Sequence, residues 1–129
     1  MSGPCLNLLT IRSIDIDRSA QFYASLGLSF SRHRHGAGPI HYSAESEGLV
    51  FEIHPLREGD SSTRSARLGF RIRDLEAALH NLLTAGATLI ARPTPSPWGE
   101  RAIVEDPDGH KIELLAQQAS PDSIEDVPA

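Results

Sequence analysis

The sequence has little of what would place it among disulfide-rich, membrane or secreted proteins. Its 129 residues include one cysteine, Cys5, which cannot form a disulfide within the chain. No apolar run approaches the roughly 20 residues that a membrane-spanning helix requires. The N-terminal residues also lack the basic and apolar regions of a secretory signal. We therefore expect a cytoplasmic protein with no membrane partner.

Positive charge is scarce as well. The formal net charge at pH 7 is -5, whereas a nucleic-acid-binding protein needs a basic face that displaces counterions from the phosphates. The one basic cluster, residues 32–35, is short and is typical of a solvated loop. We therefore expect no nucleic-acid partner.

The remaining composition is that of a compact domain, with 40% hydrophobic and 22% charged residues. A chain of this length forms one domain and buries enough apolar surface for a core without disulfides. Residues 119–129 are acidic and have few apolar side chains. We therefore predict a single domain over residues 1–118 and a flexible acidic tail over residues 119–129.

An internal repeat organises this domain. The segment IRSIDIDRSAQFYASLGLSF, which begins at residue 11, aligns with FRIRDLEAALHNLLTAGATL, which begins at residue 70. Asp15 then matches Asp74, and Gly27 matches Gly86. A duplicated unit indicates the architecture more firmly than local propensities do. The predicted modules span residues about 5–56 and about 66–117.

Each module has the pattern of a strand, a helix and three further strands. An aspartate suited to cap a helix precedes apolar residues at helical spacing, and a glycine suited to end the helix follows them. Turns rich in Gly and Pro, including residues 93–99 and 106–109, separate the later strands. We predict an α+β fold of two tandem βαβββ modules. The expected strands are 6–12, 28–32, 40–44 and 49–54, then 68–72, 88–92, 102–105 and 111–116.

Strand alternation assigns charged residues to one face of each sheet. When the apolar residues pack on the helices, Glu52 and Glu113 occupy equivalent positions on the face away from them. Arg67 and Arg71 share that face in the second module, and Arg12 shares it in the first. An isolated buried charge is very unfavourable, so these groups must pair with each other, bind a metal or bind a polar ligand.

Three motifs are similar to those of a known superfamily. They are IDIDRSAQFYASLGL at 14–28, LVFEI at 49–53 and WGERAIVEDPDGHKIEL at 98–114. They resemble the vicinal oxygen chelate (VOC) superfamily, which includes glyoxalase I, bleomycin-resistance proteins, fosfomycin-resistance enzymes and extradiol dioxygenases. The resemblance implies a curved mixed sheet around a central cavity, a small-molecule ligand and a homodimer.

The resemblance also implies where a metal would bind. The four ligand positions of the metal-dependent members correspond to Leu8, Glu52, Arg67 and Glu113. Leu8 has no donor atom, and the permanently cationic Arg67 would repel a divalent ion. We therefore predict no metal at these positions. A divalent ion such as Ni, Zn, Mn or Fe would need a histidine from elsewhere in the chain.

Histidines outside the aligned positions leave alternatives open. His41 lies within a predicted strand and His35 ends the basic loop before it, so both are candidate ligand-binding residues if His41 points inward. Otherwise His41 is half-buried and His35 is solvated. His54 shares the parity of Glu52 and either supports it as a partner or marks the end of the strand. We expect the other three histidines to be exposed: His33, His80 and His110.

Four further residues are candidates for ligand binding. Arg67 either neutralises a glutamate in place of the metal or clamps a carboxylate or phosphate of the ligand with its parallel donors. Trp98 either stacks on a flat ligand or packs against its own loop. Arg12 and Arg71 are the other two candidates, because Arg12 shares the sheet face of Glu52 and Arg71 shares that of Glu113.

Two functional hypotheses follow. In the first, the protein is a glyoxalase-like lyase or isomerase that uses Glu52 or Glu113 as the base, because a carboxylate in a partly apolar pocket holds a proton more readily. In the second, it is a non-catalytic protein of the bleomycin-resistance type that sequesters its ligand. Both hypotheses predict a small polar or anionic ligand.

Overall fold

The structure, a computed structural model, describes residues 3–117. The chain divides into two compact units at the boundary between Thr63 and Arg64. The tail predicted for residues 119–129 lies outside the described residues. Between residues 3 and 117, no helix is both long and apolar enough to cross a lipid bilayer.

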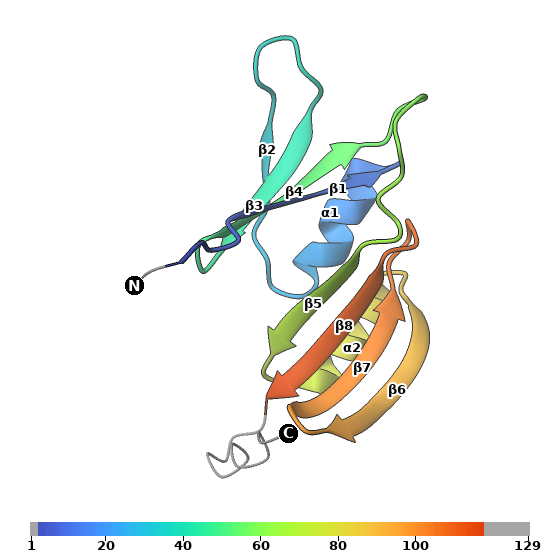
Figure 1. The fold of residues 1–129 in the computed structure, drawn as a ribbon. Helices are drawn as coiled ribbons and strands as arrows, with labels where there is room; N and C mark the ends of the chain where they lie inside the picture. The colour runs from blue at the N-terminus through green and yellow to red at the C-terminus, as the bar shows by residue number, and fades with distance from the viewer. Residues whose placement is uncertain (1–2, 118–129) are drawn as a thin grey trace. The chain divides into compact units, whose positions relative to one another are not determined.

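The first unit is a mixed four-stranded sheet with one helix on one of its faces (Figure 1). The strand order is β1-β4-β3-β2, in which β1 is parallel to β4 and the other neighbours are antiparallel. Its elements are β1 (Leu8–Ser13), α1 (Ile16–Ala24), β2 (Ser31–His33), β3 (His41–Ser46) and β4 (Leu49–Pro55).

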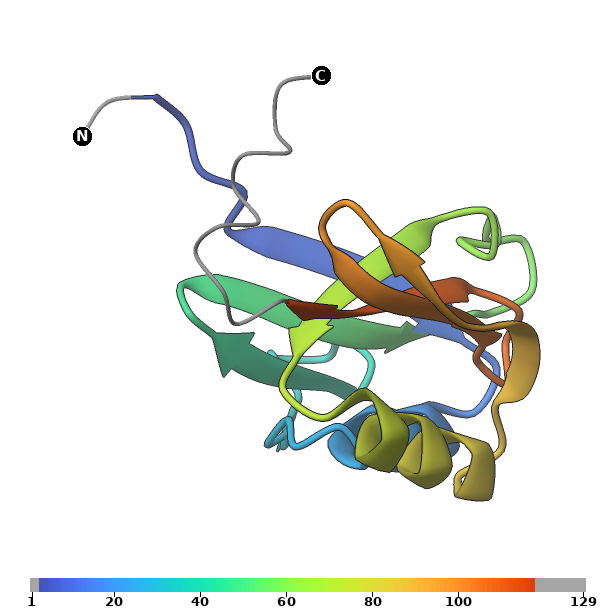
Figure 2. The ribbon, with the colours of Figure 1, turned by 90° about the horizontal axis from the view of Figure 1, so that it is seen from below.

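The second unit repeats this architecture. Its strand order is β5-β8-β7-β6, with β5 parallel to β8, and α2 lies along one face of the sheet (Figure 2). The order of elements confirms the predicted α+β fold of two βαβββ modules. The elements are β5 (Arg67–Ile72), α2 (Leu75–Thr84), β6 (Thr88–Ser96), β7 (Gly99–Glu105) and β8 (Lys111–Gln117).

The repeated aspartates lie at the start of the two helices and the repeated glycines follow their ends, as predicted. The Asp15 side chain accepts a hydrogen bond from the backbone N–H of Arg18, and Asp74 accepts one from Ala77, each over 3.1 Å. These bonds satisfy one of the N–H groups that a helix leaves unpaired at its N-terminus. Gly27 and Gly86, which follow the helices, have φ angles of 105° and 113°, a region that side chains disfavour.

Each helix covers the apolar face of its own sheet. Tyr23 of α1 is fully buried and contacts Phe51 of β4 edge to face, with ring centroids 5.0 Å apart. In the second unit, Leu114 of β8 is fully buried. Burying one such side chain contributes about 1.5–3 kcal/mol. Because side chains alternate along a strand, this packing directs Glu52 and Glu113 away from the helices.

The Pro-rich segment expected to be a loop is largely strand. We predicted a turn over residues 93–99, but β6 continues through Pro93 and Pro95 to Ser96. β6 is the edge strand of its sheet and its pairing shifts register on both sides of Ala91. Proline is tolerated at such an edge because its missing N–H need not serve a ladder. The connection to β7 therefore shortens to residues 97–98.

His110 is fully buried, so the prediction that it is exposed was wrong. Its Nδ1 lies 2.9 Å from Asp106 Oδ2, and Asp106 Oδ1 also accepts the backbone N–H groups of Asp108 and His110. The carboxylate thus organises the turn between β7 and β8, and the same contacts draw the imidazole inward. His80, on α2, is exposed as predicted.

Candidate functional site

The candidate site of the first unit lies on the sheet face that points away from α1, which we call the helix-free face. In the antiparallel register of β3 and β4, Tyr42 lies opposite the buried Ile53 and Ser43 lies opposite Glu52. Cross-strand partners share a face, so His41 and His54 project on the same side as Glu52. Tyr42 projects on the other side, where its hydroxyl donates to Asp17 of α1.

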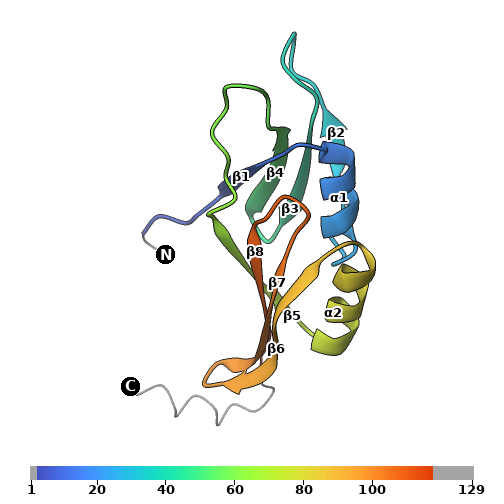
Figure 3. The ribbon, with the colours of Figure 1, turned by 90° about the vertical axis from the view of Figure 1, so that its right-hand side faces the viewer.

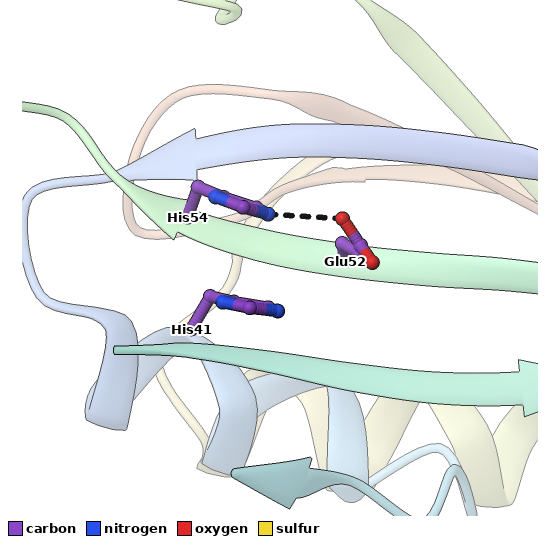
Figure 4. A group of neighbouring side chains, drawn as sticks. All are labelled: His41, Glu52 and His54. Carbon is purple, nitrogen blue, oxygen red and sulfur yellow. Dashed lines mark hydrogen bonds and ion pairs between the residues drawn. The ribbon is translucent and has the colours of Figure 1, made fainter. Parts of the chain in front are cut away.

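Three of these side chains form a cluster (Figure 4). His54 Nε2 lies 2.9 Å from Glu52 Oε1, and the His41 and His54 rings stack with centroids 4.4 Å apart and planes 9° from parallel. One donor atom from each of the three lies within 4.8 Å of the other two. His41 is only 5% exposed. His41 is therefore buried, not half-buried, and it lies on the helix-free face beside Glu52 and His54.

Two further imidazoles lie near this cluster: His33 is the last residue of β2, and His35 stands in the connection between β2 and β3, whose path Figure 3 shows. The His35 ring centroid lies 5.2 Å from that of His41, and His33 stacks on His35 with centroids 6.0 Å apart. Arg34 Nε donates to the carbonyl of Gly38 and so braces this connection. His35 itself is exposed. The rings of four histidines are thus neighbours: His33, His35, His41 and His54.

In the second unit, Glu113 projects from β8 between two arginines. Arg67 Nε lies 3.6 Å from Glu113 Oε1, and Arg101 Nε lies 3.7 Å from Glu113 Oε2. Arg67 therefore neutralises a glutamate, one of the two alternatives open for it. The sequence analysis missed Arg101, although its position two residues before Ile103, which pairs with Glu113, places it on the same face.

A pocket of about 320 Å³ adjoins Arg101 in the second unit. Two guanidinium groups and two hydroxyl groups contribute to its wall, which suits a ligand with a carboxylate or phosphate group. The sequence analysis did not predict this pocket, because the expected strand ended at Arg92, before the lining residues Thr94, Pro95 and Ser96. The lining residues are Ala91, Arg92, Thr94, Pro95, Ser96, Arg101 and Ile103.

Arg12 is bound within the first unit. Its Nη1 donates to the carbonyl of Pro55 at a distance of 3.0 Å and to Asp60 Oδ2 at 3.3 Å. The pKa of Asp60 lies below its usual value because the backbone N–H of Arg57 donates to it and because Arg12 and Arg57 lie nearby. Arg12 thus fastens the segment after β4 to the end of β1.

The other two candidates are open to solvent. Arg71 is exposed on β5. Trp98 lies in the β6–β7 connection with 68% of its surface exposed. Most of the indole is therefore available for contact with another molecule rather than packed against its own loop.

The positions that hold metal in metal-dependent members of the VOC superfamily do not fit a cation in this chain. Leu8 is 51% exposed and has no donor atom, and Arg67 is an ion-pair partner of Glu113. Glu52 has nitrogen donors beside it, but they come from His41 and His54. These two histidines stand on β3 and at the end of β4, outside the aligned positions.

Two modules, each with a glutamate on the face of its sheet away from the helix, define a small protein of the α+β class. Comparison with known families agrees. A family model described as Glyoxalase/Bleomycin resistance protein/Dioxygenase superfamily matches residues 6–114. The chain belongs to this superfamily, which confirms the resemblance seen in its motifs.

Individual relatives are similar over nearly the whole chain. A protein of Synechocystis sp. described as a probable lactoylglutathione lyase is 29% identical over 124 residues, covering 87% of this chain and 95% of its own. The structure of TnmS3, described as an antibiotic binding protein from Streptomyces sp. CB03234, has a TM-score of 0.72 at 20% identity and covers 92% and 99% of the two chains. A glyoxalase-related enzyme from Fulvimarina pelagi has a TM-score of 0.70 at 22% identity, covering 86% of each.

Proposed function

We propose that the protein is a lyase or isomerase of a small polar or anionic molecule, in which Glu52 accepts and returns the proton. The observation that carries the proposal is the bond of 2.9 Å between Glu52 and His54 on the helix-free face. A carboxylate held by an imidazole is a common acid–base pair in proton transfer. Relatives described as probable lactoylglutathione lyases support the same reaction class.

The two glutamates differ in how free they are to accept a proton. Both carboxylate oxygens of Glu113 have a guanidinium partner. In the ion pairs recorded for residues 3–117, Glu52 has His54 as its partner and no arginine or lysine. Glu52 is therefore the proposed base, and Glu113 is proposed to orient Arg67 and Arg101 toward an anionic group of the ligand.

His54 has a defined part in this mechanism. With its Nε2 protonated, it donates to Glu52 Oε1 and fixes the plane of the carboxylate, which leaves Oε2 to receive a proton from an acidic C–H of the substrate. His41 stacks on His54 and limits the rotation of that ring. Such fixed geometry is what a transferred proton requires.

The test is a turnover screen by proton NMR in D₂O on small carbonyl compounds and their thiol adducts. We expect exchange or conversion of at least one compound, and a loss of about 100-fold or more in kcat for Glu52→Gln. Glu45→Gln is the matched control, because Glu45 is an exposed residue of β3 on the same sheet face, and it should retain the rate. Equal turnover by the Glu52→Gln variant would contradict the proposal.

A second candidate function is ligand sequestration without chemistry. The pocket lined by Arg92 and Arg101 favours it, as does the similarity to a structure described as an antibiotic binding protein. It predicts stoichiometric binding of an anionic compound with no change in the compound. Arg101→Ala should weaken binding about tenfold or more, measured by isothermal titration calorimetry. The exposed Arg73 offers the control Arg73→Ala.

A further inference from the structure

The first unit brings together three side chains that can ligate a metal: Glu52, which occupies an aligned metal position, and two histidines that lie outside those positions. Two imidazoles and one carboxylate converge on the helix-free face, supplied by β3 and β4. This donor set suits divalent ions of the late first row, which prefer imidazole nitrogen combined with carboxylate oxygen. Mg²⁺ and Ca²⁺ prefer oxygen ligands throughout.

We propose that His41, Glu52 and His54 form a binding site for a divalent transition-metal ion, built entirely within the first unit. It does not require Leu8, Arg67 or Glu113. Glu52 supplies the oxygen donor of this site. His41 of the neighbouring strand β3 and His54, two residues after Glu52 on β4, supply the nitrogen donors. The remaining coordination positions of the ion are left for water or ligand.

The separations between donor atoms are compatible with one shared ion. With bonds of about 2.1 Å, adjacent donors at right angles are ~3 Å apart and opposite donors ~4.2 Å apart. The distance of 2.9 Å from His54 Nε2 to Glu52 Oε1 matches an adjacent pair. All three donors already lie within 4.8 Å of one another.

Burial and charge also favour the ion. His41 is 5% exposed and His54 and Glu52 are half-buried, so the side chains lose little freedom when they bind. The cation takes the place of the direct contact between His54 Nε2 and Glu52 Oε1. Arg12, which lies opposite His54 in the β1–β4 register, is paired with Asp60, so its charge is partly neutralised.

The inference shares Glu52 with the proposed function. One carboxylate oxygen ligates the ion, and the second remains available to a substrate proton. The experiment therefore reads metal binding and not turnover. Chelator-treated full-length protein is titrated with Co²⁺ and Zn²⁺ by calorimetry, and the visible absorption of the Co²⁺ form reports its ligands.

We expect one ion per chain and a rise in melting temperature with the ion. The variants His41→Ala, His54→Ala and Glu52→Gln should each raise the Kd by about tenfold or more. His54→Gln, at a half-exposed position, provides a second test in case His41→Ala fails to fold. His80→Ala and Glu45→Gln are matched controls, because both residues are exposed and lie outside the cluster, and they should leave the Kd unchanged.

Three results would overturn the inference: no binding of either ion at millimolar concentration, unchanged affinity in the His54 variants, or loss of the ion in Glu113→Gln. Its failure is distinguishable from that of the proposed function. If the chelator-treated protein turns over a compound, and this turnover is lost in Glu52→Gln, the proposed function is supported even when calorimetry detects no bound ion. One bound ion per chain without turnover of any compound would support the metal site and contradict the proposed function.

Discussion

Glu52 and Glu113 occupy equivalent positions in the two modules, yet their partners give them different chemistry. Glu52 lies beside two imidazoles, whereas Glu113 lies between two guanidinium groups. Imidazole can gain or lose a proton near neutral pH, and in its neutral form it can ligate a metal ion. Guanidinium stays protonated and can do neither. The first site is thus suited to proton transfer or metal binding, and the second to holding an anion.

The buried pair of Asp106 and His110 predicts a large effect on stability. Asp106→Ala would leave the His110 imidazole and two backbone N–H groups of the turn without their acceptor. We expect a loss of about 2–4 kcal/mol in the free energy of unfolding, measured by urea denaturation. The exposed Glu100 supplies the control Glu100→Gln, which should change stability by less than about 0.5 kcal/mol. Equal stability of the two variants would show that the pair is not needed.

Tyr42 predicts a change at alkaline pH. The pKa of Tyr42 is raised above its usual value because its hydroxyl donates to Asp17 and because burial disfavours the phenolate. A raised pKa means that this contribution to stability is present below the pKa of the unfolded chain and is lost as pH rises through the folded pKa. Ultraviolet titration should show that Tyr42 ionises above the usual pH range of tyrosine and that this ionisation moves to lower pH in Asp17→Asn. An unchanged titration would contradict the contact.

Strand parity predicted much of the candidate site at the scale of single residues. Parity places Glu52 with His54 and Glu113 with Arg67 because the side-chain period of a strand is two. Parity does not reveal which charged groups meet across strands, since that depends on register. Arg101 was missed because the expected strand began at residue 102, whereas β7 begins at Gly99. His110 was missed because its burial follows from a side-chain bond within a turn.

At the scale of elements, the helix caps follow directly from the sequence. Asp15→Ala should lower the free energy of unfolding by about 1 kcal/mol, because the side chain satisfies a backbone N–H at the start of α1. Asp15→Ser should recover most of this loss, as serine accepts the same bond. Thermal or urea denaturation of the two variants provides the comparison. Equal losses in both would indicate that the cap is not the cause.

The strands β2 and β6 were harder to predict than the helices. Pro93 and Pro95 are typical of a loop, and only the edge position of β6 makes them compatible with a strand. β2 is only three residues long and begins after residues 28–30 of the expected strand. An edge strand forms because it pairs with a neighbouring strand, and the local sequence of the edge strand does not contain that information.

At the scale of the whole molecule, the repeat accounts for the architecture. The match between the segments that begin at residues 11 and 70, together with the turns that separate the later strands, predicts both modules, because each repeat builds the same order of strands and helix. The prediction of a curved sheet around a central cavity depends on the resemblance rather than on the repeat.

Exposed apolar side chains support the prediction of a homodimer. Leu8, Leu83, Leu89 and Ile90 are between 37% and 51% exposed on β1, α2 and β6. Contact with a second copy would remove such surface from water, which is favourable in proportion to its area. Size-exclusion chromatography with light scattering should give a mass near twice 14.0 kDa. A mass of 14.0 kDa at micromolar concentration would contradict the prediction.

The most direct test of the central claim is the position of a bound ion. Crystals of the full-length protein grown with Zn²⁺ are measured at wavelengths on either side of the zinc absorption edge. The account predicts one anomalous peak per chain at about 2.1 Å from donor atoms of His41, Glu52 and His54. An ion beside Glu113, or a fully occupied ion elsewhere with these three side chains unligated, would contradict it.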